Sequence, residues 1–298
     1  MYTLLAATSS IHWVDYLIVV ASILLAVVMG FYFAHRQKDS NAYFTASGRV
    51  PDWAIGMSIF ATLISSVTFL AYPGAAYAGN WILLVQGLMV PIVLVSLIGL
   101  IVPLFRKVIK LSTYEYFERR FGAFARFYSS IAFVLTHFTK MGSVFFLVSM
   151  ALAQFMNLDI YWVIAVLGVT IILLTFLGGM EAIIWMDVIQ GGMLIGGGLI
   201  CIVLLLFAIG TPFSAGDILQ TAWNATTNVG PYEVSKIGIG PFEWDLVETT
   251  FLVMVLNGFF YALQKYGTDQ TIVQRYLTAK DDKSAKKAAF IGVFLSVP

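Results

Sequence analysis

The most constraining feature of this sequence is a series of apolar stretches, most of them long enough to cross a lipid bilayer. A helix needs about 20 apolar residues to span the hydrocarbon core. With 60% hydrophobic and 11% charged residues, the chain has too little polar surface for a soluble domain of this size. We therefore predict an all-α membrane protein with several spans. The apolar stretches are 11–34, 53–78, 81–104, 127–153, 160–177, 182–208, 246–264 and 288–298.

The two ends of the chain carry separate expectations. The stretch 11–34 is longer than the apolar core of a signal peptide and has no basic cluster before it, so we expect a retained helix. The stretch 288–298 is too short to cross a bilayer. We therefore expect the chain to be truncated, with further helices after Pro298. Between the spans, residues 209–245 are predicted to form a long extracellular loop.

Lysine and arginine residues gather in alternate loops. Cytoplasmic loops of membrane proteins carry an excess of these residues, so we predict that the basic loops are cytoplasmic and the N-terminus is outside, with the chain in the plasma (inner) membrane. The net charge of +1 gives no reason to expect a nucleic-acid partner. The basic residues used here are Arg36, Lys38, Arg49, Arg106, Lys107, Lys110, Arg119, Arg120, Arg126, Lys265, Arg275, Lys280, Lys283, Lys286 and Lys287.

The stretch 53–78 combines hydroxyl residues at mid-depth, including Ser65 and Thr68, with Pro73 and Gly74 further along. Non-helical backbone inside a membrane is tolerated only where protein covers it or where it lines a cavity. The pattern predicts a broken helix, whose free carbonyls and hydroxyls can bind a small cation or a polar solute. The alternative is a kinked packing helix whose hydroxyls bond to the preceding turn.

Three ionisable residues within or beside the spans require either a counter-charge or a functional role, because buried charge is costly in a membrane. Lys140 lies about 20 Å from either end of its stretch by the helical rise, and His137 shares its face. Asp187 can ligate sodium, accept a proton or stabilise a helix N-terminus. Asp269 and Gln270 follow the stretch 246–264, where the helix either leaves the membrane or breaks within it. A structural ion pair is the alternative role for Lys140.

The sequence lacks the motifs of an enzyme active site. The three histidines have no metal-ligand spacing, and neither a phosphate-binding glycine loop nor a nucleophile elbow is present. We predict that the protein is not an enzyme and that the chain does not itself use ATP.

Five segments, taken in this order, resemble the sodium:solute symporter family, which includes the sodium/glucose and sodium/sialic acid cotransporters. The resemblance implies a LeuT-type core of two inverted five-helix repeats, preceded by one extra helix, here 11–34. The first repeat would be 53–208, and 246–298 would be the start of the second repeat, which is incomplete. The segments are GMSIFATLISSVTF at 56–69, STYEYFERRFG at 112–122, FTKMGS at 138–143, FLGGMEAIIWMDVIQ at 176–190 and TDQTIVQRYLTAK at 268–280.

The resemblance also implies where ligands bind. The main sodium site would use the carbonyls of Ala61 and Ile64, and Asp187 would bind a second sodium ion as in some family members. The solute contacts implied by the resemblance, together with one nearby polar candidate, Gln86, are Ser65, Thr68, Gln86, Lys140, Asp269 and Gln270.

On this template we expect sodium-coupled symport of a small polar solute by alternating access, through a bilayer. A sugar or polyol is favoured, because Asp269 would repel an anionic solute. One alternative is a sugar acid such as sialic acid, whose carboxylate could pair with Lys140. Others are a transporter-like sensor domain of a signalling protein and a sodium channel on the same scaffold.

Overall fold

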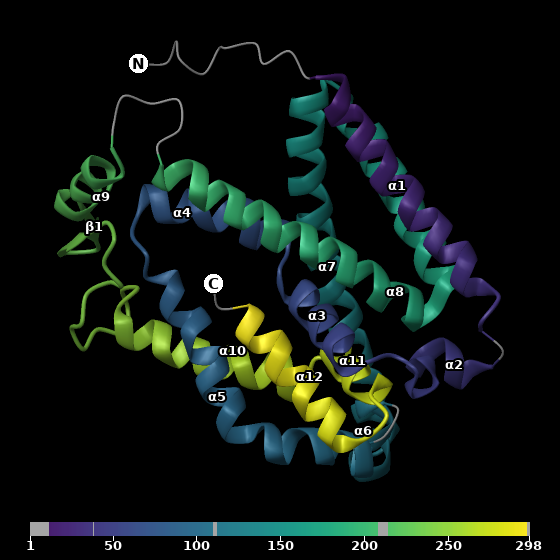
Figure 1. The fold of residues 1–298 in the computed structure, drawn as a ribbon. Helices are drawn as coiled ribbons and strands as arrows, with labels where there is room; N and C mark the ends of the chain where they lie inside the picture. Colours follow the sequence, from purple (N-terminus) through teal and green to yellow (C-terminus); the bar gives the residue numbers. More distant parts are fainter. Residues whose placement is uncertain (1–11, 38, 110–111, 208–213, 297–298) are drawn as a thin grey trace.

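The computed structural model describes residues 12–37, 39–109, 112–207 and 214–296, and these are mostly helical (Figure 1). Parts of the predicted stretches, namely Ile11, 208–213 and 297–298, lie outside the described residues. The elements are α1 (Trp13–Ala34), α2 (Ser40–Thr45), η1 (Ala46–Gly48), α3 (Asp52–Leu63), η2 (Val67–Ala71), α4 (Tyr72–Ala78), α5 (Leu83–Pro103), η3 (Leu104–Ile109), α6 (Thr113–Phe121), α7 (Ala123–Met156), α8 (Ile160–Leu206), α9 (Ala215–Asn224), β1 (Thr226–Val229), β2 (Tyr232–Ser235), α10 (Phe251–Gly267), α11 (Gln270–Thr278) and α12 (Asp282–Leu295).

Within the described ranges, four helices are long and apolar enough to cross a membrane: α1, α5 with η3, α7 and α8. The pair formed by α3 and by η2 with α4 is a fifth candidate, bent by 61°. The shorter α10 and α12 have 17 and 14 residues. These features support the prediction of a membrane protein with several spans.

α8 accounts for two of the predicted spans. Its 47 residues would extend about 70 Å if straight, more than twice the thickness of the hydrocarbon core. The backbone of Gly179 is non-helical, with φ 59° and ψ −159°, a conformation open to glycine alone. In Figure 1 one arm of α8 runs beside α1 and the other leads towards α9.

The first predicted break is present, but not at the proline. α3 ends with a bond from the Ile64 N–H to the Phe60 carbonyl (3.2 Å), and Ile64 then turns to extended backbone, with φ −79° and ψ 130°. Pro73 lies in the first turn of α4, after the π-helical residues of η2. Because proline lacks an N–H, a local π-type turn is one way to accommodate it. The bend itself lies at Ile64–Ser66.

The second stretch that ends in polar residues also breaks rather than leaving the protein. α10 ends at Gly267, and Asp269 caps the N-terminus of α11 by accepting a bond from the Thr271 N–H (3.0 Å). α11 then packs against α3, with Ile272, Val273 and Tyr276 buried in the core. Of the two alternatives left open by the sequence, the structure therefore favours a helix that breaks over one that simply leaves the membrane.

The main core lies among α3, α5, α10, α11 and α12. α3 and α12 approach closely at two glycines: a methyl group on Gly56 would lie 2.7 Å from Ile291, and one on Gly292 would lie 2.6 Å from Ile59. α12 begins at Asp282, six residues before the predicted stretch at 288. This additional turn and a half carries part of the contact, including buried Ala285.

The C-terminal end of α11 is held by Arg106 of η3. Its guanidinium donates to the Asp282 carboxylate (2.8 Å) and to the carbonyls of Tyr276 (2.6 Å) and Ala279 (2.7 Å). These carbonyls lie at the end of α11, where the helical hydrogen bonds stop, and the Tyr276 carbonyl also accepts a bond from the Ala279 N–H (3.4 Å). Next to this contact, the bond from the Ser284 N–H lowers the pKa of Asp281, which caps α12.

The predicted extracellular loop contains structure of its own. β1 and β2 form an antiparallel hairpin in which Thr226 pairs with Ser235, and Lys236 then donates to the Tyr77 carbonyl at the end of α4 (2.8 Å). The predicted span 246–264 begins too early. Asp245 accepts bonds from the N–H groups of Val247 and Glu248, which makes a turn, and α10 starts only at Phe251.

We predict that Gly292→Ala destabilises the protein by about 1–3 kcal/mol, because the added methyl overpacks the contact between α3 and α12. The matched control is Gly196→Ala, where the methyl meets no described atom within 4 Å and helix propensity favours alanine. Thermal unfolding of the purified protein in detergent measures both. Equal melting temperatures for the two variants would contradict the close contact.

Candidate functional site

A small pocket lies where the two broken helices and α7 meet. α3 supplies its residues just before the first break, and α10 and α11 supply those on either side of the second. Breaks in membrane helices expose backbone and polar groups where a ligand can reach them. The pocket is lined by Thr62, Leu63, Lys140, Tyr261, Lys265, Thr271 and Ile272.

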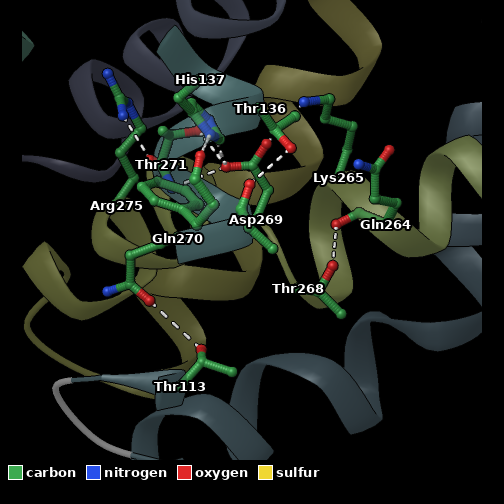
Figure 2. Close-up of polar contacts among 12 residues, drawn as sticks. Thr113, Thr136, His137, Gln264, Lys265, Thr268, Asp269, Gln270, Thr271 and Arg275 are labelled. Carbon is green, nitrogen blue, oxygen red and sulfur yellow. Dashed lines mark hydrogen bonds and ion pairs between the residues drawn. The ribbon is translucent and has the colours of Figure 1, made fainter. Parts of the chain in front are cut away.

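Asp269 lies beside this pocket at the second break, and its side chain is only 4% exposed. The carboxylate accepts bonds from the Thr271 N–H and hydroxyl (3.0 and 2.7 Å) and from the Lys265 ammonium (2.7 Å). Lys265 is 13% exposed, so this ion pair bridges the break within the protein. Figure 2 shows Asp269 among the residues of α7, α10 and α11 that surround it.

His137 brings α7 to the same place. Its Nδ1 lies 3.1 Å from the Phe133 carbonyl one turn earlier, and its Nε2 lies 3.7 Å from an Asp269 oxygen. The latter distance is too long for a hydrogen bond. The imidazole therefore lies beside the second break without donating a hydrogen bond to Asp269.

A second polar cluster joins α3, α8 and α11. Arg275 of α11 donates to Asp187 of α8 (2.9 Å) and to the hydroxyl of Ser58 in α3 (2.7 Å), and Ser58 in turn donates to the same Asp187 oxygen (2.5 Å). Arg275 is 8% exposed. A buried guanidinium needs this many acceptors, because an unpaired charge would be very costly there. The other Asp187 oxygen takes no part in these bonds.

The residues predicted for the main sodium site lie at the first break. The Ala61 carbonyl lies beyond the last hydrogen bond of the α3 ladder, and Ile64 is the first extended residue. The Ser65 N–H donates to the Thr68 hydroxyl (3.4 Å) instead of continuing the helix. Unused carbonyl oxygens at such a point are suitable ligands for a hard cation.

Five of the six predicted solute contacts are not among the pocket residues, namely Ser65, Thr68, Gln86, Asp269 and Gln270. Gln86 is half-buried in α5, where its backbone packs against Gly258 of α10. Gln270 accepts from the Thr113 hydroxyl of α6 (3.4 Å) and donates to Gln274 (3.1 Å), as Figure 2 shows for the contact with Thr113. Of the predicted solute residues, only Lys140 lines the pocket directly, and Asp269 lies behind it.

The sequence interpretation missed the roles of Lys265 and Arg275, which were counted as basic residues of a cytoplasmic loop. Both form buried ion pairs instead. Lys265 lies four residues before Asp269, a spacing at which opposite charges meet on a helix, so a signal for that pair was present. No local pattern pairs Arg275 with Asp187, 88 residues away.

These features define a helical membrane protein with two broken helices around a polar site. The model of the sodium:solute symporter family matches residues 43–297, and the chain belongs to that family. The resemblance inferred from the five sequence segments is thereby confirmed.

Similar proteins share this assignment. The chain is 34% identical to the sodium/sialic acid symporter NanT of Aliivibrio fischeri and 30% identical to the symporter SiaT of Proteus mirabilis, over 92% of its length in each case. A solved structure of a Na⁺-coupled sialic acid symporter, in a substrate-bound outward-open state, matches 96% of the chain with a TM-score of 0.87 and 30% identity. The chain spans 52% and 53% of the two curated relatives and 59% of the chain in the solved structure.

We predict that Arg275→Gln lowers stability strongly, by about 3–5 kcal/mol, because it leaves the Asp187 carboxylate without its charged partner. The double variant Arg275→Gln/Asp187→Asn should recover part of this loss, with a coupling energy of about 0.5–3 kcal/mol. Thermal unfolding of the wild type, both single variants and the double variant measures the cycle. Strictly additive losses would show that the two side chains do not interact.

Proposed function

We propose that this chain forms the part of a sodium-coupled symporter that contains both broken helices, and that the transported solute is a sugar acid. The membrane would be the plasma (inner) membrane, with the N-terminus outside. The single observation that carries the proposal is the pocket between the two breaks, lined by Lys140 and Lys265. Two ammonium groups at a solute site favour a carboxylate over a neutral sugar.

The ion pair at the second break changes the argument about the solute. From the sequence, Asp269 favoured a neutral sugar or polyol because its charge would repel an anion. In the structure Lys265 neutralises that charge at 2.7 Å, so this objection no longer holds. The names of the two bacterial relatives, both sodium/sialic acid symporters, support the same class of solute.

Sodium would bind first at the carbonyls of Ala61 and Ile64, with Asp187 as a ligand of a second ion. Filling these positions would stabilise the geometry of the first break, and the solute would then bind beside it with its carboxylate at Lys140. Rocking of the two broken helices against α7 and α8 would expose the site to the other side. Each charge that crosses 100 mV contributes about 2.3 kcal/mol to accumulation.

We predict sodium-dependent accumulation of N-acetylneuraminic acid, and not of glucose, by the full-length protein in proteoliposomes. Lys140→Gln should weaken its apparent affinity by about tenfold or more, because a hydrogen bond to a charged group contributes about 1.5–3 kcal/mol. The assay is uptake of labelled solute with an inward sodium gradient. Its control replaces the sodium gradient with potassium. Accumulation of glucose would refute the choice of solute, and uptake that ignores sodium would refute symport.

We predict that Asp187→Asn makes the dependence of uptake on sodium less steep, because one carboxylate ligand is lost while the carbonyl site remains. The Hill coefficient for sodium, measured at saturating solute, should fall towards one. Ser58→Ala is the matched comparison, since it removes a hydrogen bond to Asp187 but no charge. An unchanged Hill coefficient in Asp187→Asn would assign the residue to the structural ion pair alone.

A further inference from the structure

The charges around the pocket do not cancel. Lys140 of α7 and Lys265 of α10 both line it, while a single carboxylate, Asp269, lies next to it. That carboxylate is paired with Lys265 at 2.7 Å. Among the described residues no carboxylate lies within 4.0 Å of the Lys140 ammonium group, and Asp269 acts on it only over a longer distance. One ammonium group therefore has no carboxylate in direct contact when no solute is present.

Both oxygens of Asp269 are engaged at the second break. One of its oxygens accepts two bonds from Thr271, as the cap of α11, and the other accepts from Lys265. An ammonium group has three N–H donors, and Asp269 uses one of those of Lys265. The tail of Lys265 lies over the Tyr261 ring, with Nζ 6.0 Å from its centre. Lys265 thus lines the pocket with donors to spare.

We infer that Lys265 of α10 is a second carboxylate-binding residue, which binds the carboxylate of the solute together with Lys140 of α7. The inference rests on the proposed function and deepens it. Two ammonium groups and one fixed carboxylate complement a single negative charge, so the solute class is a monoanion. A neutral sugar would leave Lys140 uncompensated, and a dianion would add an unpaired negative charge beside Asp269.

The arrangement also separates the roles of the two lysines. Lys140 depends on the solute for its counter-charge, whereas Lys265 shares its donors between the solute and Asp269. Because Lys265 precedes the second break and Asp269 follows it, solute binding draws on the same ammonium group that bridges the break. Solute binding therefore changes the contact between α10 and α11 at the second break.

The test removes the charge from the ligand as well as from the protein. N-acetylneuraminic acid and its methyl ester compete for sodium-dependent uptake by the full-length protein, and the ratio of their apparent affinities gives the preference for the carboxylate. Lys265→Gln should weaken the apparent affinity for the acid by about tenfold and the apparent affinity for the ester by less than about twofold. Lys265→Arg should keep most of the preference. Lys283→Gln, at an exposed lysine of α12, is the control and should match the wild type.

Asp269→Asn provides the opposite change, since asparagine is also a good helix cap. Without its internal competitor, Lys265 should bind the acid more tightly, so the preference for acid over ester should rise. Equal losses for acid and ester in Lys265→Gln, or an unchanged or lower preference in Asp269→Asn, would overturn the inference. Failure of the transport proposal looks different, because the wild type then shows no sodium-dependent uptake. In that case the affinities for acid and ester are compared through the thermal stabilisation that each gives to the protein in detergent. Equal stabilisation of the wild type by acid and ester would overturn the inference.

Discussion

The contact between Arg275, Asp187 and Ser58 is the interaction on which the arrangement of the broken helices depends. It joins α11, α8 and α3, three helices far apart in sequence, through one buried guanidinium. The side chains of Arg275 and Asp187 are only 8% and 20% exposed, so each charge depends largely on the other for its stabilisation. The contact therefore fixes the second broken helix relative to the first, and with it the width of the pocket between them.

At both breaks backbone N–H groups lose their helical acceptors, and a different side chain replaces those acceptors at each break. At the first, the Thr68 hydroxyl accepts from the Ser65 N–H where the helical ladder stops. At the second, the Asp269 carboxylate caps α11 and is itself neutralised by Lys265. The first break thus carries the carbonyls of Ala61 and Ile64, while the ammonium groups of Lys140 and Lys265 line the pocket beside the second break. That polarity suits a cation and an anionic solute bound side by side.

Several parts of this architecture were predictable, because they depend on local sequence. The apolar stretch at 53–78 with hydroxyls at its centre predicted the first break, although Pro73 was given a part that belongs to Ile64 and Ser65. The gap between the predicted stretches 160–177 and 182–208 contains Gly179, where the backbone of α8 is non-helical. The residues that line the pocket were harder to predict from the sequence: Lys140 lines it, while Gln86 and Gln270 do not.

The sequence by itself determined the membrane class, the order of the helices and the family, since apolar length, glycine position and short motifs are properties of neighbouring residues. Only the tertiary structure decided which charges meet. Asp187 and Arg275 are 88 residues apart, and the meaning of each charge changed once its partner was known. Asp269, alone an argument against an anionic solute, became half of an ion pair. The reason is physical: in a medium of low dielectric the effect of a charge is set by its nearest counter-charge, and folding alone brings the two together.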